Sequence, residues 1–226
     1  MASPQMQYEL LQEQAVAYDY PKERTGFAIR CFEICFSLAA LFFLWPLIVM
    51  QWAWIRLGTP GPGLFRQRRL GRGAECFSFF KLRTMYVDAR QRWPELYAYD
   101  YNPTELEQLH FKVERDPRVT PQGHWLRPSS LDELPNFWNV IKGDMALVGP
   151  RPEIPEMLPY YSGEMLLKFS VRPGVTGLAQ VSGRGRLSFF RTVEYDLEYV
   201  RKRSFRFDLR IIWLTIVKMV CRDGAF

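Results

Sequence analysis

The feature that most constrains the fold is a run of 22 residues without a charge, ICFSLAALFFLWPLIVMQWAWI at positions 34–55. As a helix this run would rise about 33 Å, enough to cross a hydrocarbon core of about 30 Å. Acidic residues precede it and no small-residue cleavage site follows, unlike a secretory signal peptide. The alternative is the core helix of a soluble protein. A helix so long, apolar on every face and rich in tryptophan at one end favours a membrane segment.

Pro46 lies in the middle of this segment. It removes one backbone donor and clashes with the carbonyl of Phe42, so we expect a bend with two arms, each about half the bilayer's depth. Basic residues flank both sides of the segment: Lys22, Arg24 and Arg30 before it, and Arg56, Arg66, Arg68, Arg69 and Arg72 after it. Because Lys and Arg gather at cytoplasmic ends, these flanks favour a re-entrant segment that enters and leaves by one face. A kinked spanning helix with its short N-terminus outside stays open.

A second membrane-facing candidate lies near the C-terminus, where residues 193–220 mix bulky apolar and aromatic side chains with basic ones. This composition is typical of an amphipathic helix that lies on anionic headgroups. The alternative is an ordinary surface helix packed on the domain.

The composition excludes several classes of protein. Hydrophobic residues make up 48% of the 226 residues and the net charge is +6, which is inconsistent with disorder or collagen-like repeats. The four cysteines form no CxxC pair and the chain has only two histidines, so we expect no zinc site and a reduced, cytosol-facing protein. Nucleic-acid binding would rest on the net charge alone, because the aromatic residues cluster with apolar ones.

Residues 58–186 form a polar region punctuated by glycine and proline. The pattern predicts short strands around 64–67 and 75–82, and short helices at 92–96 and 104–112. We therefore expect a mixed α+β fold dominated by helices, with little strand.

The adjacent acids Asp132 and Glu133 allow two interpretations. Ser130, followed three residues later by Glu133, matches a helix capping box, in which Asp132 also favours the positive end of the helix dipole. Alternatively, since adjacent helical residues point about 100° apart, one carboxylate acts as a nucleophile while the other holds a hard cation.

Charged residues elsewhere favour the second interpretation. Arg127 and Arg151 can clamp phosphate oxygens bidentately, and Lys81, Arg83 and Asp144 are further candidates for a substrate site. The set suits phosphoryl chemistry on a diphosphate substrate, with Mg²⁺ offsetting the repulsion between a carboxylate and the phosphates. No P-loop motif G-x-x-x-x-G-K-[ST] occurs in the sequence.

Four stretches closely resemble the bacterial sugar transferases, which are monotopic polyprenyl-phosphate phosphoglycosyl transferases. They are KLRTM at 81–85, DPRVT at 116–120, LRPSSLDELPNFWNVIKGDMALVGPRPE at 126–153 and RPGVTGLAQVSGR at 172–184. The likeness runs from about residue 24 to the end. The terminal RDGAF is similar to the undecaprenyl-phosphate hexose (galactose or glucose) branch.

The resemblance implies transfer of a sugar 1-phosphate from a UDP-sugar to polyprenyl phosphate, with release of UMP. This reaction starts polysaccharide or glycoconjugate assembly. Asp132 would carry the phosphosugar covalently and Glu133 would bind Mg²⁺. The resemblance also implies phosphate-holding and basic-site residues, namely Arg127, Arg151, Lys81 and Arg83.

The resemblance also implies an architecture, in which a proline-broken re-entrant helix at 28–57 holds the site at the cytoplasmic face of the bacterial inner membrane. Trp45 precedes Pro46 where smaller members have serine, so the freed carbonyl near Phe42 has to be satisfied differently. We expect four segments: 1–23 at the N-terminus, 24–57 as the re-entrant helix, 58–186 as the catalytic region and 187–226 as interfacial helices and tail. Larger relatives carry an N-terminal multi-span region, so this chain resembles the catalytic core alone.

The expected partners are the UDP-sugar, the polyprenyl phosphate lipid and the membrane, with no nucleic acid, and a homo-oligomer is compatible with the sequence. A membrane-anchored, non-catalytic scaffolding protein on anionic lipid is the competing hypothesis. Tolerance of Glu133→Gln and no UMP release from any UDP-sugar would favour it.

Overall fold

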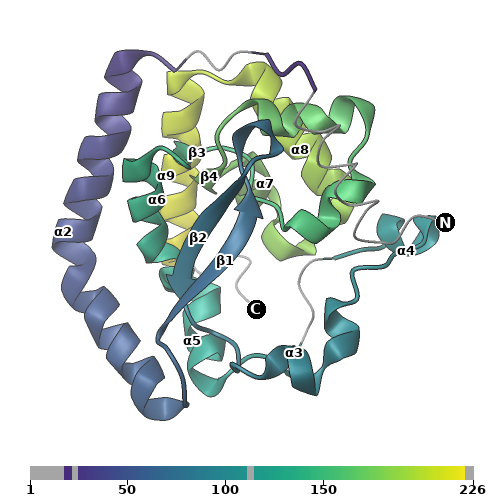
Figure 1. Cartoon of the computed structure of the whole chain (residues 1–226). Helices are drawn as coiled ribbons and strands as arrows, with labels where there is room; N and C mark the ends of the chain where they lie inside the picture. Colours follow the sequence, from purple (N-terminus) through teal and green to yellow (C-terminus); the bar gives the residue numbers. More distant parts are fainter. Residues whose placement is uncertain (1–17, 22–24, 111–114, 222–226) are drawn as a thin grey trace.

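The computed structural model describes residues 18–21, 25–110 and 115–221, and begins with the long helix α2 (Phe27–Gly58). The 32 residues of α2 correspond to about 48 Å of helix. Figure 1 shows α2 bowed along one side of the molecule, with its concave side toward the other elements. The helix passes through Pro46 uninterrupted, since a proline removes one backbone donor while the neighbouring turns keep theirs. The expected break at Pro46 is therefore absent, and the bow occurs within one continuous helix.

The pattern of burial along α2 is the reverse of that in a soluble core helix. Its buried residues share one face of the helix: Glu33, Ser37, Gln51 and Ile55. Large apolar side chains on its other faces are exposed, including Phe42 at 70%, Phe43 at 74% and Trp45 at 58%. Within the described residues, α2 is the one helix long and apolar enough to cross a membrane. Because water disfavours so large an apolar surface, the outer side of α2 requires an apolar environment.

A β-hairpin follows α2 and confirms the two predicted strands. β1 (Leu64–Leu70) and β2 (Cys76–Leu82) pair antiparallel, with the 3₁₀ turn η1 (Arg72–Ala74) between them. Phe65 lies opposite Lys81, and Arg69 lies opposite Phe77. Because side chains alternate along a strand, one face of the hairpin carries the odd-numbered residues of both strands.

Short elements connect the hairpin to the second half of the chain. They are α3 (Ala89–Arg92), η2 (Pro94–Tyr97), α4 (Pro103–Glu107), α5 (Pro121–Ser129), η3 (Leu131–Asn136) and α6 (Phe137–Lys142). The helices predicted at 92–96 and 104–112 correspond to η2 and α4, but α4 ends at Glu107 and residues 111–114 lie outside the described part. Asn102 and Glu105 form a capping box at the start of α4.

The second half surrounds a two-stranded parallel sheet. β3 (Ala146–Val148) pairs with β4 (Gly174–Thr176). The helical elements around it are η4 (Pro155–Tyr160), η5 (Gly163–Ser170), α7 (Leu178–Ser182), η6 (Arg184–Arg186), α8 (Phe189–Lys202) and α9 (Phe205–Cys221). The expected fold class, helix-dominated with little strand, is confirmed.

The last two helices differ in how they use their apolar residues. α8 buries Phe189, Val193 and Tyr199 against the rest of the molecule. α9 leaves an apolar stripe exposed, with Trp213 at 65% and Leu209 at 41%. α8 therefore fits a packed surface helix, whereas α9 fits the interfacial one. The N-terminal segment 1–23 falls outside the described residues apart from 18–21, and the terminal RDGAF lies outside them entirely.

Candidate active site

The 3₁₀ helix η3 carries the two adjacent acids. Ser130 ends α5 in the left-handed conformation, with φ 56° and ψ 16°, and its carbonyl accepts a hydrogen bond from Glu133 N at 3.1 Å. Ser130 makes no side-chain cap hydrogen bond. The predicted capping box is therefore wrong, because the left-handed residue turns the chain into a 3₁₀ helix and Glu133 points to another partner.

That partner is Arg151, which follows β3. Its Nη2 lies 2.5 Å from Glu133 Oε1, and its Nη1 donates to Oε2 at 3.3 Å. The guanidinium stays 45% exposed, whereas the Glu133 side chain is 16% exposed. Although burial acts in the opposite direction, Arg151 holds the pKa of Glu133 below its usual value. Glu133 is therefore an ionised, mostly buried carboxylate, and the guanidinium of Arg151 that keeps it ionised is accessible to solvent.

Asp132 is more deeply buried, at 6% exposure. Burial and the neighbouring Glu133 raise the pKa of Asp132 to about 6, while Lys81, Arg127 and Arg151 act to lower it. A carboxylate whose pKa lies just below neutral is mostly ionised at neutral pH and remains basic enough to attack phosphorus.

Two further predicted cations act on Asp132. Lys81, on β2, is half-buried, and burial lowers its pKa to about 8 while Asp132 opposes that shift. Arg127, at the end of α5, is 30% exposed and lies 3.7 Å from Asp116. The structure thus brings Lys81, Arg127 and Arg151 together around the acid pair.

The other two predicted residues have different surroundings. Arg83 is buried and holds the loop after α2, donating to Pro62 O at 2.7 Å and Thr59 O at 2.9 Å. Asp144 accepts from Lys142 at 2.7 Å and from Asn139 at 3.3 Å, within the turn after α6. These contacts favour local structural roles, and a substrate role for either residue stays a prediction.

Residues 24–222 match the bacterial sugar transferase family. This chain belongs to that family. The resemblance drawn from the four sequence stretches is therefore confirmed over nearly all of the chain.

Relatives of this sugar transferase differ in length. It is 36% identical over 211 residues to the UDP-galactose-lipid carrier transferase of Erwinia amylovora, which covers 93% of this chain and 44% of that protein. It is 35% identical to the undecaprenyl-phosphate galactose phosphotransferase of Salmonella typhimurium, covering 91% and 43%. It is 34% identical to the exopolysaccharide production protein ExoY of Rhizobium meliloti, covering 89% of both chains. The sugar transferase thus spans less than half the length of the first two relatives.

Arg69 is a further cation of the site. In the sequence it is indicated only as one of the basic residues that follow the apolar segment. Its Nη1 donates to Pro152 O at 3.2 Å and its guanidinium lies 5.5 Å from the Phe79 ring. Burial and Arg151 lower the pKa of Arg69 to about 10, while Glu153 and Glu133 oppose this shift. The alternation of side chains along β1 is the sequence signal that could have placed Arg69 at the site, since Arg69 lies on the same strand face as Phe65 and Gln67.

Behind the site lies a sealed charge cluster, which we define as Glu153, Tyr161, Lys168 and Asp196. Lys168 Nζ lies 3.2 Å from Asp196 Oδ2, 3.6 Å from Glu153 Oε2 and 3.0 Å from Tyr161 Oη. Tyr161 in turn donates to Glu153 at 2.8 Å. No sequence signal identifies this cluster, because its members are spread over 44 positions, with Lys168 on η5, Asp196 on α8, and Glu153 and Tyr161 in the connections before them.

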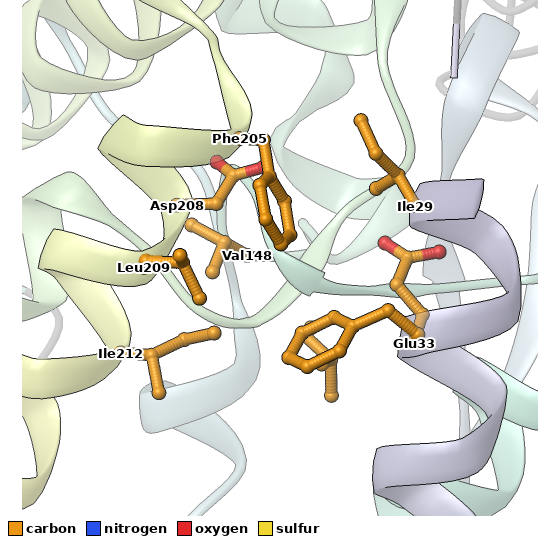
Figure 2. Close-up of a pocket in the computed structure, with 9 residues that line it drawn as sticks. Ile29, Glu33, Val148, Phe205, Asp208, Leu209 and Ile212 are labelled. Carbon is orange, nitrogen blue, oxygen red and sulfur yellow. The ribbon is translucent and has the colours of Figure 1, made fainter. Parts of the chain in front are cut away.

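A third charged junction fixes the start of α2. Arg30 and Arg172 both lie 3.1 Å from Glu33, and Arg30 also donates to Val140 O at 2.6 Å. Figure 2 shows the adjoining small pocket, into which Glu33 from α2 and Asp208 from α9 both project among apolar side chains. Burial raises the pKa of Asp208 to about 6. This junction anchors the start of α2 to α6 and to the segment before β4.

The acid pair offers the hard oxygen donors that Mg²⁺ prefers. No group of three or more His, Cys, Asp or Glu side chains suited to a metal occurs among the described residues. Mg²⁺ nevertheless commonly uses one or two carboxylates and completes its shell with water and substrate phosphates. Two carboxylates beside several cations therefore fit this ion, and the assignment of Glu133 as its ligand stays a prediction.

Proposed function

We propose that the sugar transferase moves a sugar 1-phosphate from a UDP-sugar to polyprenyl (undecaprenyl) phosphate, through a covalent phosphosugar on Asp132. The observation that supports it most is the buried, partly basic Asp132 within a group of three cations, Lys81, Arg127 and Arg151. Cations outnumber the two carboxylates, so the site favours a polyanionic substrate. The names of two relatives, a UDP-galactose-lipid carrier transferase and an undecaprenyl-phosphate galactose phosphotransferase, agree with this substrate class.

In the first step, a carboxylate oxygen of Asp132 attacks the phosphorus that bears the sugar. The bond from that phosphorus to the bridging oxygen breaks, and UMP leaves with the electron pair. Arg127 and Arg151 stabilise the charge that develops on the phosphoryl oxygens. Lys81 offsets the repulsion between Asp132 and the incoming diphosphate.

In the second step, an oxygen of the lipid phosphate attacks the same phosphorus. The bond to Asp132 breaks, which regenerates the carboxylate and releases the polyprenyl diphosphosugar. When bound by Glu133, Mg²⁺ would neutralise phosphate charge, which favours the departure of UMP in the first step. No residue has to deliver a proton in either step, because both leaving groups are stable anions.

The exposed apolar surfaces of α2 and α9 support a membrane-bound enzyme. We propose that α2 is re-entrant, with both ends at the headgroup level and its bow in the hydrocarbon, and that the site faces the cytoplasm. A lipid phosphate sits at headgroup level, so this placement brings the lipid and the soluble nucleotide to one carboxylate.

UMP release from a panel of UDP-sugars, with Mg²⁺ and with or without undecaprenyl phosphate, tests the proposal. We expect one sugar, for instance UDP-glucose or UDP-galactose, to give about one UMP per protein without lipid and continuous turnover with lipid. If no UDP-sugar releases UMP and Glu133→Gln changes nothing measurable, the scaffolding hypothesis replaces this one.

A further inference from the structure

An exposed aromatic ring lies beside the cation that faces Asp132. Phe65, on β1, is 40% exposed, and Lys81 Nζ lies 5.5 Å from its ring centroid. The two residues are direct cross-strand neighbours, so their side chains share one face of the hairpin. Lys81 is the cation that acts most strongly on Asp132. An apolar surface and an ammonium group therefore adjoin each other next to the nucleophile.

This ring continues an apolar surface that starts on α2. Trp52 is 44% exposed and packs on the turn that leads into β1, where a Cβ on Gly63 would approach its ring to 2.5 Å. Glycine at position 63 thus permits the close contact between α2 and the hairpin. Gly63 continues the hairpin ladder, since its carbonyl accepts a hydrogen bond from Arg83 N at 2.8 Å. Positions 63 and 65 point to the same side of an extended strand, so Trp52 and Phe65 lie on one face of the hairpin.

The cations on the other carboxylate have a different setting. Arg151 pairs with Glu133, and Arg69 lies among Arg151, Glu133 and Glu153. Arg69 also lies over a ring, that of Phe79, but this ring is buried and offers no apolar surface to a ligand. A polar, hydrogen-bonded setting of this kind suits a charged, water-soluble group. An apolar ring beside an ammonium suits an anion attached to a hydrocarbon chain.

From this difference we propose that Phe65 and Trp52 form the subsite for the first isoprenyl units of the lipid acceptor, with Lys81 receiving its phosphate. The inference rests on the proposed function and assigns residues to its second substrate. The chain of the acceptor passes over Phe65 and Trp52 toward the outer, apolar side of α2. Its phosphate is then held beside Asp132, where the second step needs it.

The test measures the two half-reactions of the Phe65→Ala variant separately, namely release of UMP from the donor and transfer of the phosphosugar to the lipid. UMP release without lipid should stay within about twofold of wild type, as should the KM for the UDP-sugar. The KM for undecaprenyl phosphate should rise by about tenfold, the effect of losing one well-packed apolar contact. Phe65→Leu, which keeps an apolar side chain, should restore most of this loss.

Phe190→Ala is the matched control, since Phe190 is an aromatic residue of similar exposure, 36%, on α8. It should leave both KM values unchanged. Liposome co-sedimentation should be the same for all variants, because Phe65 acts on the acceptor and not on membrane binding. In detergent, wild type should use farnesyl phosphate as acceptor better than ethyl phosphate. Phe65→Ala should lose this preference and use the two acceptors about equally well.

The outcomes distinguish this inference from the proposed function. If wild type releases UMP without lipid but Phe65→Ala keeps a wild-type KM for undecaprenyl phosphate, the subsite is wrong and the function stands. A rise confined to the KM for the UDP-sugar would assign Phe65 to the donor instead and overturn the inference. If wild type releases no UMP from any UDP-sugar, the proposed function fails first.

Discussion

Two clusters of buried carboxylates lie close together in this protein and are built differently. At the acid pair, two carboxylates meet three cations, and Arg151 and Arg127 remain 45% and 30% exposed. In the sealed cluster, the carboxylates of Glu153 and Asp196 meet one cation, Lys168, which is 2% exposed. One cluster has positive charge in excess and open to solvent, whereas the other is closed.

This difference indicates which cluster binds a substrate. A reachable excess of cations attracts an anion, and its guanidinium groups can exchange a carboxylate for a phosphate at little cost. A closed ion pair has no access for a ligand, and its charges are stable only while all partners are present. We therefore expect changes at the acid pair to affect activity, and changes in the sealed cluster to affect folding.

The largest effect is expected for Asp132→Asn. The amide is a far poorer nucleophile, so kcat should fall by roughly 10³-fold or more. Thermal unfolding should show a native-like transition, since Lys81 is only half-buried and keeps the neighbouring carboxylate of Glu133. UMP release with undecaprenyl phosphate measures the loss, and near wild-type turnover would contradict the covalent proposal.

Lys168→Met should act on stability instead. It leaves Glu153 and Asp196 buried without their cation, which costs on the order of 3–5 kcal/mol in the free energy of unfolding. Chemical denaturation in detergent measures this quantity. The exposed Lys202→Met on α8, whose partner Glu198 is also solvent-accessible, is the matched control and should change stability by less than about 1 kcal/mol. Equal effects for the two variants would remove the distinction between the clusters.

Arg151→Gln should lower activity more than stability, in contrast to Lys168→Met. Loss of a charge-assisted contact to the reacting phosphate should lower kcat/KM by roughly 10²-fold. The loss of stability should be smaller than for Lys168→Met, because a half-exposed cation contributes less than a sealed one. A stability loss matching that of Lys168→Met, with unchanged kinetics, would place Arg151 in the structural class.

The pH dependence tests the electrostatics of Asp132. Because its pKa is raised to about 6 and the nucleophile must be ionised, kcat/KM should fall as the pH drops through about 6. Arg127 lowers the pKa of Asp132, so Arg127→Gln should move this acidic limb to higher pH. Profiles of UMP release from about pH 4 to about pH 8, which bracket that pKa by about two units, measure the shift in a buffer of constant ionic strength. If kcat/KM did not fall between about pH 8 and about pH 5 in either protein, the assignment would be contradicted.

The smallest effect is expected for Asp144→Asn. Asp144 contacts Lys142 and Asn139, and half-exposed contacts of this kind contribute little. Turnover should stay within about twofold of wild type. A loss of tenfold or more would return Asp144 to the substrate site that the sequence favoured.

The sequence alone predicted the features that depend on local pattern. The apolar run at 34–55, the alternating strands of the hairpin and the motif around Asp132 each lie within one short stretch. Each therefore carries its signal in neighbouring residues. The continuous course of α2 through Pro46 could not be predicted in the same way, because it depends on tertiary contacts near both ends of the helix. Glu33 pairs with Arg172 near one end, and Ile55 packs with Leu82 and Leu126 near the other.

Features that depend on contacts between distant segments were missed. Glu133 was open to interpretation as a cap until Arg151, 18 residues later, was found beside it. Lys168 and Asp196 meet only because η5 and α8 pack together. Arg83 was predicted to line the basic substrate site; its guanidinium donates to backbone carbonyls of the loop after α2, and its substrate role stays a prediction. A charge in a sequence does not reveal its partner, and the partner decides its role.

The most direct test of the central claim is intact-protein mass spectrometry, followed by peptide mapping, after incubation with the UDP-sugar and Mg²⁺ in the absence of lipid. We predict one added phosphosugar per chain, located on Asp132, that disappears when undecaprenyl phosphate is added. Lipid-dependent turnover without any adduct on Asp132, or with the adduct on another residue, would contradict this account.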